Sequence, residues 1–342
     1  MDRQTGPTMG PNGLFTDGDP QNGIQGSQPR AGWANGVTEE LRNLIVDSGQ
    51  EPDFEDYTQV GQAIRVLAGA VGGARNALIN GGFQIWQRAF EGNVTASEEY
   101  IADRWAVRAD DPGGSCQATI RRESFVTSDP GVPGSPQYNL RFVQTSLPTS
   151  GVPRMAQRIE DVRTFAGQTI TISGSVRGDS IIEVRPTITQ NFGSGGDASV
   201  AVGQEVWQVS AGWTRFEWTV AVPSTFGKSA GPGSFLELAF VFPQALFSVR
   251  FAQIQVELGS SATGFDERPL DIELLLCQRY YEQSYPATVQ AGNQNRQGAT
   301  RGFDVGNAWE TLNTRFRVAK RATPAVSFYS PQAGNQGAGK IE

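Results

Sequence analysis

The chain has 342 residues, enough for about two domains and for a core that needs no disulfide or metal. Its formal net charge of -7 excludes an extended nucleic-acid-binding surface, because such a surface needs clustered lysines and arginines. The absence of histidine excludes Ser-His-Asp, Cys-His and histidine-metal catalysis. An enzymatic reading would have to use carboxylates, tyrosine, arginine or lysine.

Glycine and proline are frequent, with 41 and 19 residues, while charged residues make up only 18% of the chain. This balance is typical of short strands joined by many turns. Cys116 and Cys277 are too few for a structural zinc site, and we expect both to be buried free thiols. No stretch resembles a signal peptide or a membrane span, so we expect synthesis in a cytoplasm and no membrane insertion.

Two loops gather carboxylates that suggest calcium, one at Asp17 and Asp19 and one at Asp110 and Asp111. Neither loop has the ligand alternation of an EF-hand. We therefore expect no bound metal, and no cofactor of any other kind.

Residues 1–36 are expected to form an extended arm. The segment is rich in Gly, Pro and Asn, and it cannot bury enough apolar surface to become ordered alone. Its spaced apolar residues Leu14, Phe15, Ile24 and Trp33 would be unnecessary in a plain linker. We expect a partner to hold the arm, and the alternative is a floppy terminus.

Residues 37–79 are expected to form a helical neck. A first helix is predicted from Thr38, as N-cap, to about Gly49, and a second from about Asp53 to Gly72. Apolar residues at 3-4-3-4 spacing in the second helix are typical of a coiled-coil seam. These seam residues are Tyr57, Val60, Ile64, Leu67 and Val71. They predict an oligomer, and the alternative is an ordinary amphipathic helix on the next domain.

Residues 80–285 are expected to form a mostly β domain, an antiparallel jelly-roll-like β-sandwich. From Asn80 onward the apolar period changes from helical to two. The clearest strands are predicted at 168–178, 181–190, 215–223, 235–243 and 247–258. In the third of these, Phe216, Trp218 and Val220 share the face that we expect in the core.

The predicted sandwich ends with a short helix within 269–285. Pro269 suits the first turn, and Asp271 and Glu273 suit the positive end of the helix dipole. Helical spacing predicts a stripe of Leu270, Leu274, Leu275, Gln278 and Tyr281. Residues 286–342 are expected to form a small C-terminal β segment, with strands around 313–319 and 324–329.

Several motifs together resemble a known family. They include NALINGGFQIWQRAF, YIADRWAV, RIEDVRTFAGQTITISGSVRG and IQVELGSSATGFDERPLDIELLLCQRYYEQSY. Over roughly residues 12–330 the chain is similar to tail fibre and tail spike proteins of tailed bacteriophages and prophages. The resemblance implies an N-terminal tail-attachment region, a sandwich like a carbohydrate-binding module, and a homotrimer in the virion. Fibres of this kind often continue into a long shaft, which this sequence lacks.

The motif residues Phe83, Trp86, Asp103, Arg104 and Trp105 are interpreted as structural. A large amphipathic ring more often closes a sandwich edge than stacks on a sugar. Asp103 and Arg104 are expected either to pair with each other or to bond turn backbone. Phe83 and Ile85 are expected on one face of a first strand, with Trp86 opposite.

A glycan site requires an exposed aromatic face with polar side chains nearby. The candidates, chosen by elimination, are Trp207, Trp213, Tyr285, Trp309 and Tyr329. Glycan cleavage would require a pair of carboxylates about 5 to 9.5 Å apart. The acidic candidates are Glu98, Glu99, Asp110, Asp111, Glu160, Asp161 and Glu267. Adjacent acids on a strand point to opposite faces, so we expect no catalytic residue and no enzyme.

The favoured hypothesis is a homotrimeric phage tail fibre protein, bound to tail or baseplate proteins through its arm. Its sandwich would bind a host cell-surface glycan, and several weak sites acting together would give useful avidity. One alternative is a structural adaptor that docks another fibre or baseplate protein without glycan binding. A further alternative is a polysaccharide-cleaving tail spike.

Overall fold

The computed structural model describes residues 20–23, 31–47, 50–53, 55–64, 75–94, 98–108, 117–126, 131–147, 151–286, 289, 291–293, 297–298, 315–329 and 336–337. The chain divides into two compact units, Met1–Gly73 and Ala74–Glu342. Each unit has its own internal contacts, and the two are described separately below. Within the described ranges, no helix combines the length and the apolar character needed to cross a membrane.

The first unit contains a short 3-10 helix, η2 (Pro20–Asn22), and the helix α1 (Ala31–Asp47). Helix α1 begins seven residues before the predicted N-cap, Thr38. The Thr38 hydroxyl donates to the carbonyl of Ala34, 3.0 Å away, as a residue inside a helix does. The prediction that residues 31–36 belong to an extended arm is therefore wrong.

A second helical segment of this unit covers residues 59–64, so it begins later than the predicted Asp53. The Asp56 carboxylate accepts bonds from the Thr58 amide (2.8 Å) and the Thr58 hydroxyl (2.6 Å), which fixes a turn before the helix. Tyr57 lies in that turn and is 95% exposed, so the prediction that it is a helical seam residue is wrong. Leu67 and Val71 lie outside the described residues.

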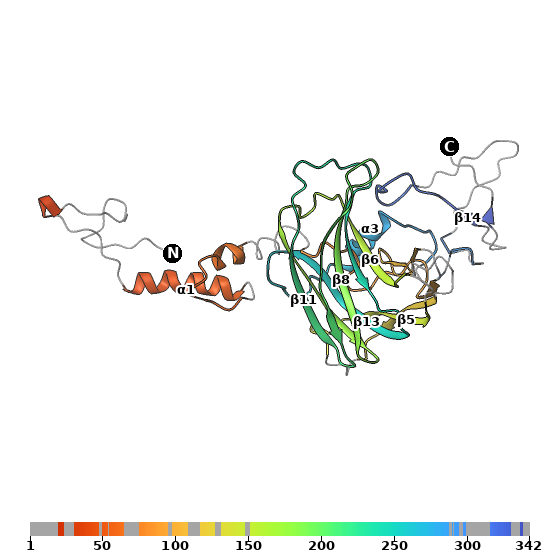
Figure 1. The fold of residues 1–342 in the computed structure, drawn as a ribbon, viewed down its shortest axis with the longest axis horizontal. Coiled ribbons are helices and arrows are strands. Elements are labelled where there is room, and N and C mark those ends of the chain that lie inside the picture. Colours follow the sequence, from red (N-terminus) through yellow and green to blue (C-terminus); the bar gives the residue numbers. More distant parts are fainter. Residues whose placement is uncertain are drawn as a thin grey trace. The chain divides into compact units, whose positions relative to one another are not determined.

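The second unit is an antiparallel β-sandwich of two sheets, as predicted (Figure 1). The first sheet has the order β1-β4-β5-β13-β7-β11. Its strands are β1 (Glu91–Val94), β4 (Gln117–Ser124), β5 (Tyr138–Ser146), β13 (Phe247–Leu258), β7 (Thr169–Gly178) and β11 (Thr214–Ala221).

The second sheet has the order β10-β8-β12-β6-β3-β2, with β9 paired to β8. Its strands are β10 (Trp207–Val209), β8 (Ile182–Asn191), β12 (Phe235–Val241), β6 (Arg154–Glu160), β3 (Ala106–Arg108), β2 (Glu99–Tyr100) and β9 (Val200–Gln204). All five strands that were clearest in the sequence are present, with ends that differ by at most two residues.

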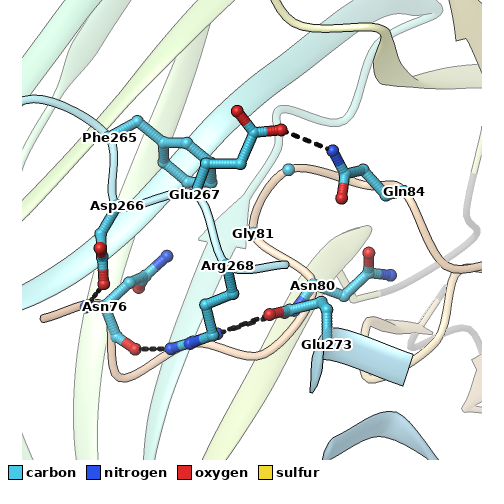
Figure 2. Close-up of a pocket in the computed structure, with 10 residues that line it drawn as sticks. Asn76, Asn80, Gly81, Gln84, Phe265, Asp266, Glu267, Arg268 and Glu273 are labelled. Carbon is cyan, nitrogen blue, oxygen red and sulfur yellow. Dashed lines mark hydrogen bonds and ion pairs between the residues drawn. The ribbon is translucent and has the colours of Figure 1, made fainter. Parts of the chain in front are cut away.

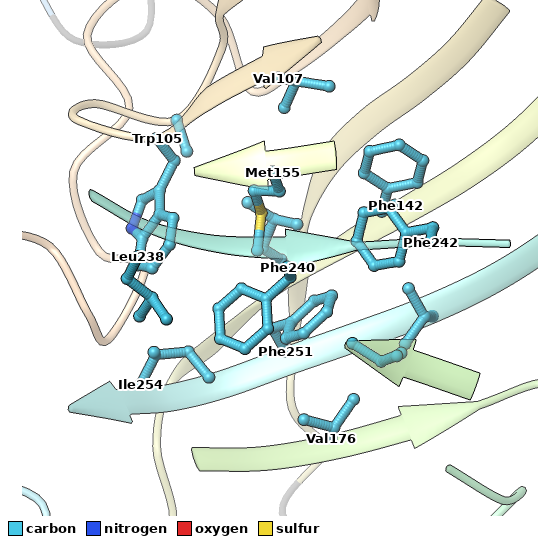
Figure 3. Packing of buried hydrophobic residues seen from close by; sticks show 14 of the residues in the cluster. Trp105, Val107, Phe142, Met155, Val176, Leu238, Phe240, Phe242, Phe251 and Ile254 are labelled. Carbon is cyan, nitrogen blue, oxygen red and sulfur yellow. The ribbon is translucent and has the colours of Figure 1, made fainter. Parts of the chain in front are cut away.

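The core lies between the two sheets and is rich in aromatic rings (Figure 3). Phe240 of β12 packs on Phe251 of β13 with ring centroids 5.0 Å apart, so the two sheets meet there. Phe142 of β5 packs on Phe242, next to β12, at 4.6 Å. Burial of side chains of this kind contributes about 1.5–3 kcal/mol each, so this contact between layers is a main source of stability.

Helix α3 (Leu270–Gln278) follows the last long strand, and its buried face is not the predicted leucine stripe. The buried residues are Glu273, Cys277 and Gln278, whereas Leu270 is 58% exposed. Gln278 of the predicted stripe is buried as expected, but Leu270 and Leu275 are exposed, because Glu273 is held inside by polar partners described below. Cys277 is a free, buried thiol, as predicted, whereas Cys116 lies outside the described residues.

The C-terminal part contains β14 (Phe328–Tyr329), which pairs with β15 (Gln336–Gly337). Residues 315–319 form no strand, so the part of the predicted strand that the structure describes is wrong. Instead, the Lys320 ammonium donates to the carbonyl of Gln278 at 2.5 Å, and the Arg321 amide donates to the carbonyl of Arg279 at 3.1 Å. These bonds satisfy carbonyls at the end of α3.

Candidate ligand-binding groove

The sandwich begins with a loop over residues 75–90, and this loop forms a hydrogen-bonded turn and not a strand. Asn80 and Phe83 have positive φ angles of 60° and 55°. The Asn80 side chain donates to the carbonyls of Ile85 (2.8 Å) and Asp103 (3.0 Å) and accepts from the Ile85 amide (2.9 Å). The prediction of a first strand with alternating faces is therefore wrong. The Asn80 side chain bonds the backbone of both Ile85 and Asp103 and so holds this segment in a turn.

The aromatic motif residues lie in the core of the sandwich, and Trp86 also lines the groove described below. Phe83, Trp86 and Trp105 are all buried. The Trp86 ring nitrogen donates to the carbonyl of Phe83 at 2.7 Å, and that of Trp105 donates to the carbonyl of Asn80 at 2.9 Å. Each indole thus fills the core and satisfies a backbone carbonyl of the loop.

The loop is anchored to α3 through Arg268 and Glu273 (Figure 2). The Arg268 guanidinium lies 2.9 Å from the Glu273 carboxylate and also donates to the carbonyls of Leu78 (2.9 Å) and Asn76. Glu273 in turn accepts from the Asn80 amide. Both side chains are nearly buried. Without the other, either charge would be left uncompensated inside the protein. The cavity among these residues holds only about 10 Å³, room for about one water molecule.

Asp103 and Arg104 do not pair with each other, which corrects one of the two predicted arrangements. Asp103 accepts from the amide (2.6 Å) and side chain (2.8 Å) of Gln87, and Arg88 lies 3.7 Å away. Arg104 donates to the carbonyl of Arg158 at 2.5 Å and stacks 3.4 Å above the ring of Tyr280. Burial raises the pKa of Asp103 and lowers the pKa of Arg104. The alternative prediction, bonds to turn backbone, is confirmed for Asp103, whereas Arg104 bonds the backbone of strand β6.

Beside this anchored loop lies a groove of about 700 Å³. The volume is within the range of small-molecule sites. Its apolar lining comes from the loop and from α3, while its polar lining comes from amide, guanidinium and carboxylate side chains. The lining residues are Gln84, Ile85, Trp86, Gln87, Phe90, Arg122, Gln137, Tyr138, Glu267, Arg268, Pro269, Leu270 and Leu274.

One part of the groove wall is a three-layer stack centred on Arg122. Its guanidinium carbon lies 3.9 Å from the ring centroid of Phe90 and 4.0 Å from that of Tyr138. Its amide bonds the carbonyl of Phe90 at 2.8 Å, and its side chain reaches the carbonyl of Gln84 at 3.5 Å. Burial lowers the pKa of Arg122, and the phenol of Tyr138 acts in the opposite direction. The stack holds an aromatic ring and a fixed cation at one place in the wall.

The groove combines an apolar surface with fixed hydrogen-bonding groups. The Gln84 side chain is oriented by a 2.8 Å bond to Glu267, which is drawn in Figure 2. Leu270 and Leu274 supply apolar surface on the α3 side. Such a surface suits a ligand with both apolar faces and hydroxyl groups, because each part finds a matching partner. Among the described residues no cluster of three or more His, Cys, Asp and Glu could hold a metal.

The residues predicted from the sequence as glycan ligands lie in different environments. Trp207 is 1% exposed, stacks on Phe216 at 5.2 Å and belongs to the core, so its assignment to a glycan site is wrong. Trp213 is half-buried beside Phe125. Tyr285 and Tyr329 meet edge to face at 6.5 Å, and Trp309 lies outside the described residues.

Four of the five described acidic candidates are held by other side chains, and the fifth, Glu99, lies in β2. Glu98 lies 2.9 Å from Arg158, and Asp161 lies 2.7 Å from Arg163. Glu160 accepts two 3.0 Å bonds from Arg279, which holds the pKa of Glu160 below its usual value. Glu267 bonds Gln84. Each of these four carboxylates has a structural partner, and Asp110 and Asp111 lie outside the described residues.

The residues of the Arg122 stack were missed by the sequence interpretation. Phe90 ends the motif NALINGGFQIWQRAF but was not singled out, and Arg122 and Tyr138 stood in no motif. Arg122 and Tyr138 are brought together by the pairing register of β4 with β5, in which Ser124 is opposite Tyr138 and Arg122 is opposite Leu140. Such a register cannot be read from spacing alone when the loop between two strands is long.

Comparisons with known proteins find no matching family model and no matching curated protein. Among solved structures, CBM4 is 17% identical over 53% of this chain and 98% of its own, with a TM-score of 0.35. The enzymatically active domain of tailspike protein 4 of Bacteriophage CBA120 is 11% identical over 54% of this chain and 22% of its own, with a TM-score of 0.35. TmCBM61, solved with β-1,4-galactotriose, is 13% identical over 54% of this chain and 100% of its own, with a TM-score of 0.32. At these scores the likenesses carry no argument about function, and the β-sandwich assignment rests on the observed strand pairing.

Proposed function

We propose that this chain is a phage tail fibre protein whose sandwich binds a glycan of the host cell surface in the groove. The observation that carries the glycan part is the Arg122 stack in the wall of a ligand-sized groove. Sugars present apolar C–H faces ringed by hydroxyl groups. The Tyr138 ring would take such a face, while Gln84, Gln137 and Arg122 would donate to hydroxyl oxygens.

The tail part of the proposal is supported by the sequence resemblance and by apolar residues on the first unit. In one copy of the chain, Leu41 is 43% exposed and Ile64 is 54% exposed. Apolar side chains at such positions gain stability when neighbouring copies cover them. A homotrimer in the virion, joined to tail or baseplate proteins through the N-terminal region, would place three grooves together and raise avidity.

We propose adsorption and not catalysis as the role of the sandwich. The Glu160 and Glu98 carboxylates are held by arginines, whereas a catalytic pair needs one group free to act as an acid. The experiment is to incubate the full chain with host polysaccharide and to measure reducing ends. We expect none above the level of a heat-denatured sample, and their release would make the chain a polysaccharide-cleaving spike.

The binding proposal is tested with the full chain and an array of bacterial surface glycans. We expect the variant Tyr138→Ala to bind its glycan at least about tenfold more weakly, a loss of about 1.4 kcal/mol. Tyr329→Ala is the matched control, because it removes a half-buried tyrosine outside the groove. Thermal melts would show that both variants remain folded.

The outcomes separate the proposal from its rivals. Equal binding by Tyr138→Ala and the parent chain, with loss in Tyr329→Ala, would place the glycan site at Tyr285 and Tyr329. A chain that binds no glycan but forms a stable complex with a purified baseplate protein would be a structural adaptor.

A further inference from the structure

Four arginines lie side by side across the first sheet. Arg121 of β4 is opposite Arg141 of β5, Arg141 is opposite Arg250 of β13, and Arg250 is opposite Arg177 of β7. Directly opposite residues of neighbouring antiparallel strands point to the same face of a sheet. At about 4.8 Å between strands, this Arg row is about 14 Å long.

The Arg row is on the outer face of the sandwich. The residues next to it along the four strands, Ile120, Phe142, Val249 and Val176, are all fully buried in the core. Because side chains alternate along a strand, the arginines point away from that core. Arg122, next to Arg121, points to the groove side, so the Arg row and the groove lie on opposite faces of β4.

Arginines in adjacent pairing positions repel one another, and that repulsion costs stability unless anions intervene. Two carboxylates lie between them here. Glu123 is 2.8 Å from Arg121, 3.1 Å from Arg141 and 2.8 Å from Arg250. Asp179 is 2.8 Å from Arg141 and also contacts Arg250.

Among the described residues, the arginines of the row nevertheless outnumber the carboxylates beside them. Glu91 of β1 is opposite Arg121 and adds a third carboxylate, which leaves four arginines with three acids. The chain as a whole has a net charge of -7, so this row differs in sign from the average of the protein. It therefore attracts anions that most of the surface repels.

The same contacts hold the guanidinium groups in fixed positions with donors to spare. Arg141 and Arg250 are only 19% and 16% exposed, and Arg141 also bonds the Ser248 hydroxyl at 2.8 Å. Within the described part of the chain, Nη2 of Arg250 and Nη1 of Arg121 have no acceptor. Donors fixed in advance lose little conformational freedom when a ligand binds.

We propose that the Arg row binds a carboxylate-bearing polysaccharide. A guanidinium matches a carboxylate with two parallel bonds, and a row of about 14 Å is too long for one carboxylate. A polymer with repeated acidic sugars fits both properties. The proposal rests on the proposed adsorption role for the source of the polymer, but it concerns a different surface from the groove.

The test uses the full chain with polygalacturonate, and with the same polymer after reduction of its carboxyl groups. We expect binding only to the acidic form, weakening as salt increases, since exposed charges are screened. Arg121→Gln should weaken binding about tenfold, because it removes one charge-assisted contact. Arg163→Gln is the matched control, since it also removes an arginine that pairs with a carboxylate two residues away, but in a loop outside the row.

Arg121→Lys provides a second variant in case Arg121→Gln does not fold. It keeps the charge but loses the planar fork, so we expect binding between that of the parent chain and that of Arg121→Gln. Binding that is equal in all four proteins, or equal for the acidic and the reduced polymer, would overturn the proposal. So would a failure to bind polygalacturonate, or a preference for inorganic polyphosphate. The groove variant Tyr138→Ala should retain this binding, which separates a failure of the Arg row from a failure of the groove.

Discussion

A Cβ atom at position 81 would lie 2.1 Å from the carbonyl oxygen of Ile254. Gly81 is therefore required where the first loop crosses β13, and its own carbonyl accepts the Ile254 amide at 3.0 Å. This close approach of two backbones connects the loop that begins the sandwich to the longest strand. It also explains the two glycines in the sequence NGGFQIWQRA. The first of them, Gly81, is needed so that the two backbones can approach, and not only so that the chain can turn.

We predict that Gly81→Ala destabilises the sandwich by about 1–3 kcal/mol, because the backbone of β13 must move away from the added methyl group. Gly82→Ala is the matched control, since its Cβ would meet Phe265 at an ordinary 3.5 Å. Urea unfolding of the two variants measures the difference. Equal midpoints would show that the loop shifts without cost and that the close approach is unimportant.

A second prediction concerns the anchor between α3 and the first loop. Glu273→Gln should cost about 3–5 kcal/mol, because it leaves the Arg268 charge nearly buried without its partner. Asp271→Asn changes an exposed carboxylate in the same first turn of α3, and it should cost no more than about 1 kcal/mol. Chemical denaturation at neutral pH compares them. Similar losses in both variants would mean that the helix dipole, and not the buried pair, accounts for the effect.

The alkaline limit of stability should depend on Tyr280. Burial raises its pKa from 10.0 to about 12, and the hydrogen bond and charge of Glu160 act in the same direction, while stacked Arg104 opposes them. Because the folded state holds this proton more tightly than the unfolded state, the contribution is complete below pH 10 and is lost between pH 10 and pH 12. Urea midpoints measured from pH 9 to 11.5 should therefore fall more steeply for the parent chain than for Tyr280→Phe. Parallel slopes would rule out this tyrosine as the group responsible.

The sandwich could be predicted from the sequence because its strands carry a local signal. Strands such as β11 alternate strictly, with Trp218 buried and Glu217 and Thr219 exposed, and a period of two needs no knowledge of neighbours. The predictions failed where long-range polar contacts decide the structure. Glu273 lies on the buried face of α3 only because Arg268 and Asn80 meet it there.

The groove and the Arg row also depend on long-range contacts that could not be predicted from the sequence. Arg121 and Arg122 are adjacent, and the sequence gives no sign that one joins a row of arginines while the other is stacked between two rings. Their roles follow from the register of β4 with β5, which places Arg121 opposite Arg141 and Arg122 beside the ring of Tyr138. Such relations depend on strand pairing between residues far apart in the chain, such as Arg141 and Arg250, which composition and spacing do not contain.

The last prediction concerns assembly through the neck. Ile64→Ser removes an apolar side chain that is 54% exposed in one copy, and in a trimer it should cost up to about 1.5–3 kcal/mol per subunit. Light scattering over a dilution series should show trimers of the parent chain and dissociation of the variant at higher concentration. Tyr57→Ser is the control: it removes an apolar side chain that is more exposed but lies in the turn before the helix, so its trimers should persist.

Circular dichroism of both neck variants should show an intact sandwich, because the second unit has its own core. Unchanged trimers of Ile64→Ser would mean that contacts between sandwiches hold the oligomer, and the seam prediction would then be wrong. A parent chain that is monomeric at all concentrations would contradict the trimer itself. In that case three grooves could not act together, and adsorption would depend on the affinity of a single site.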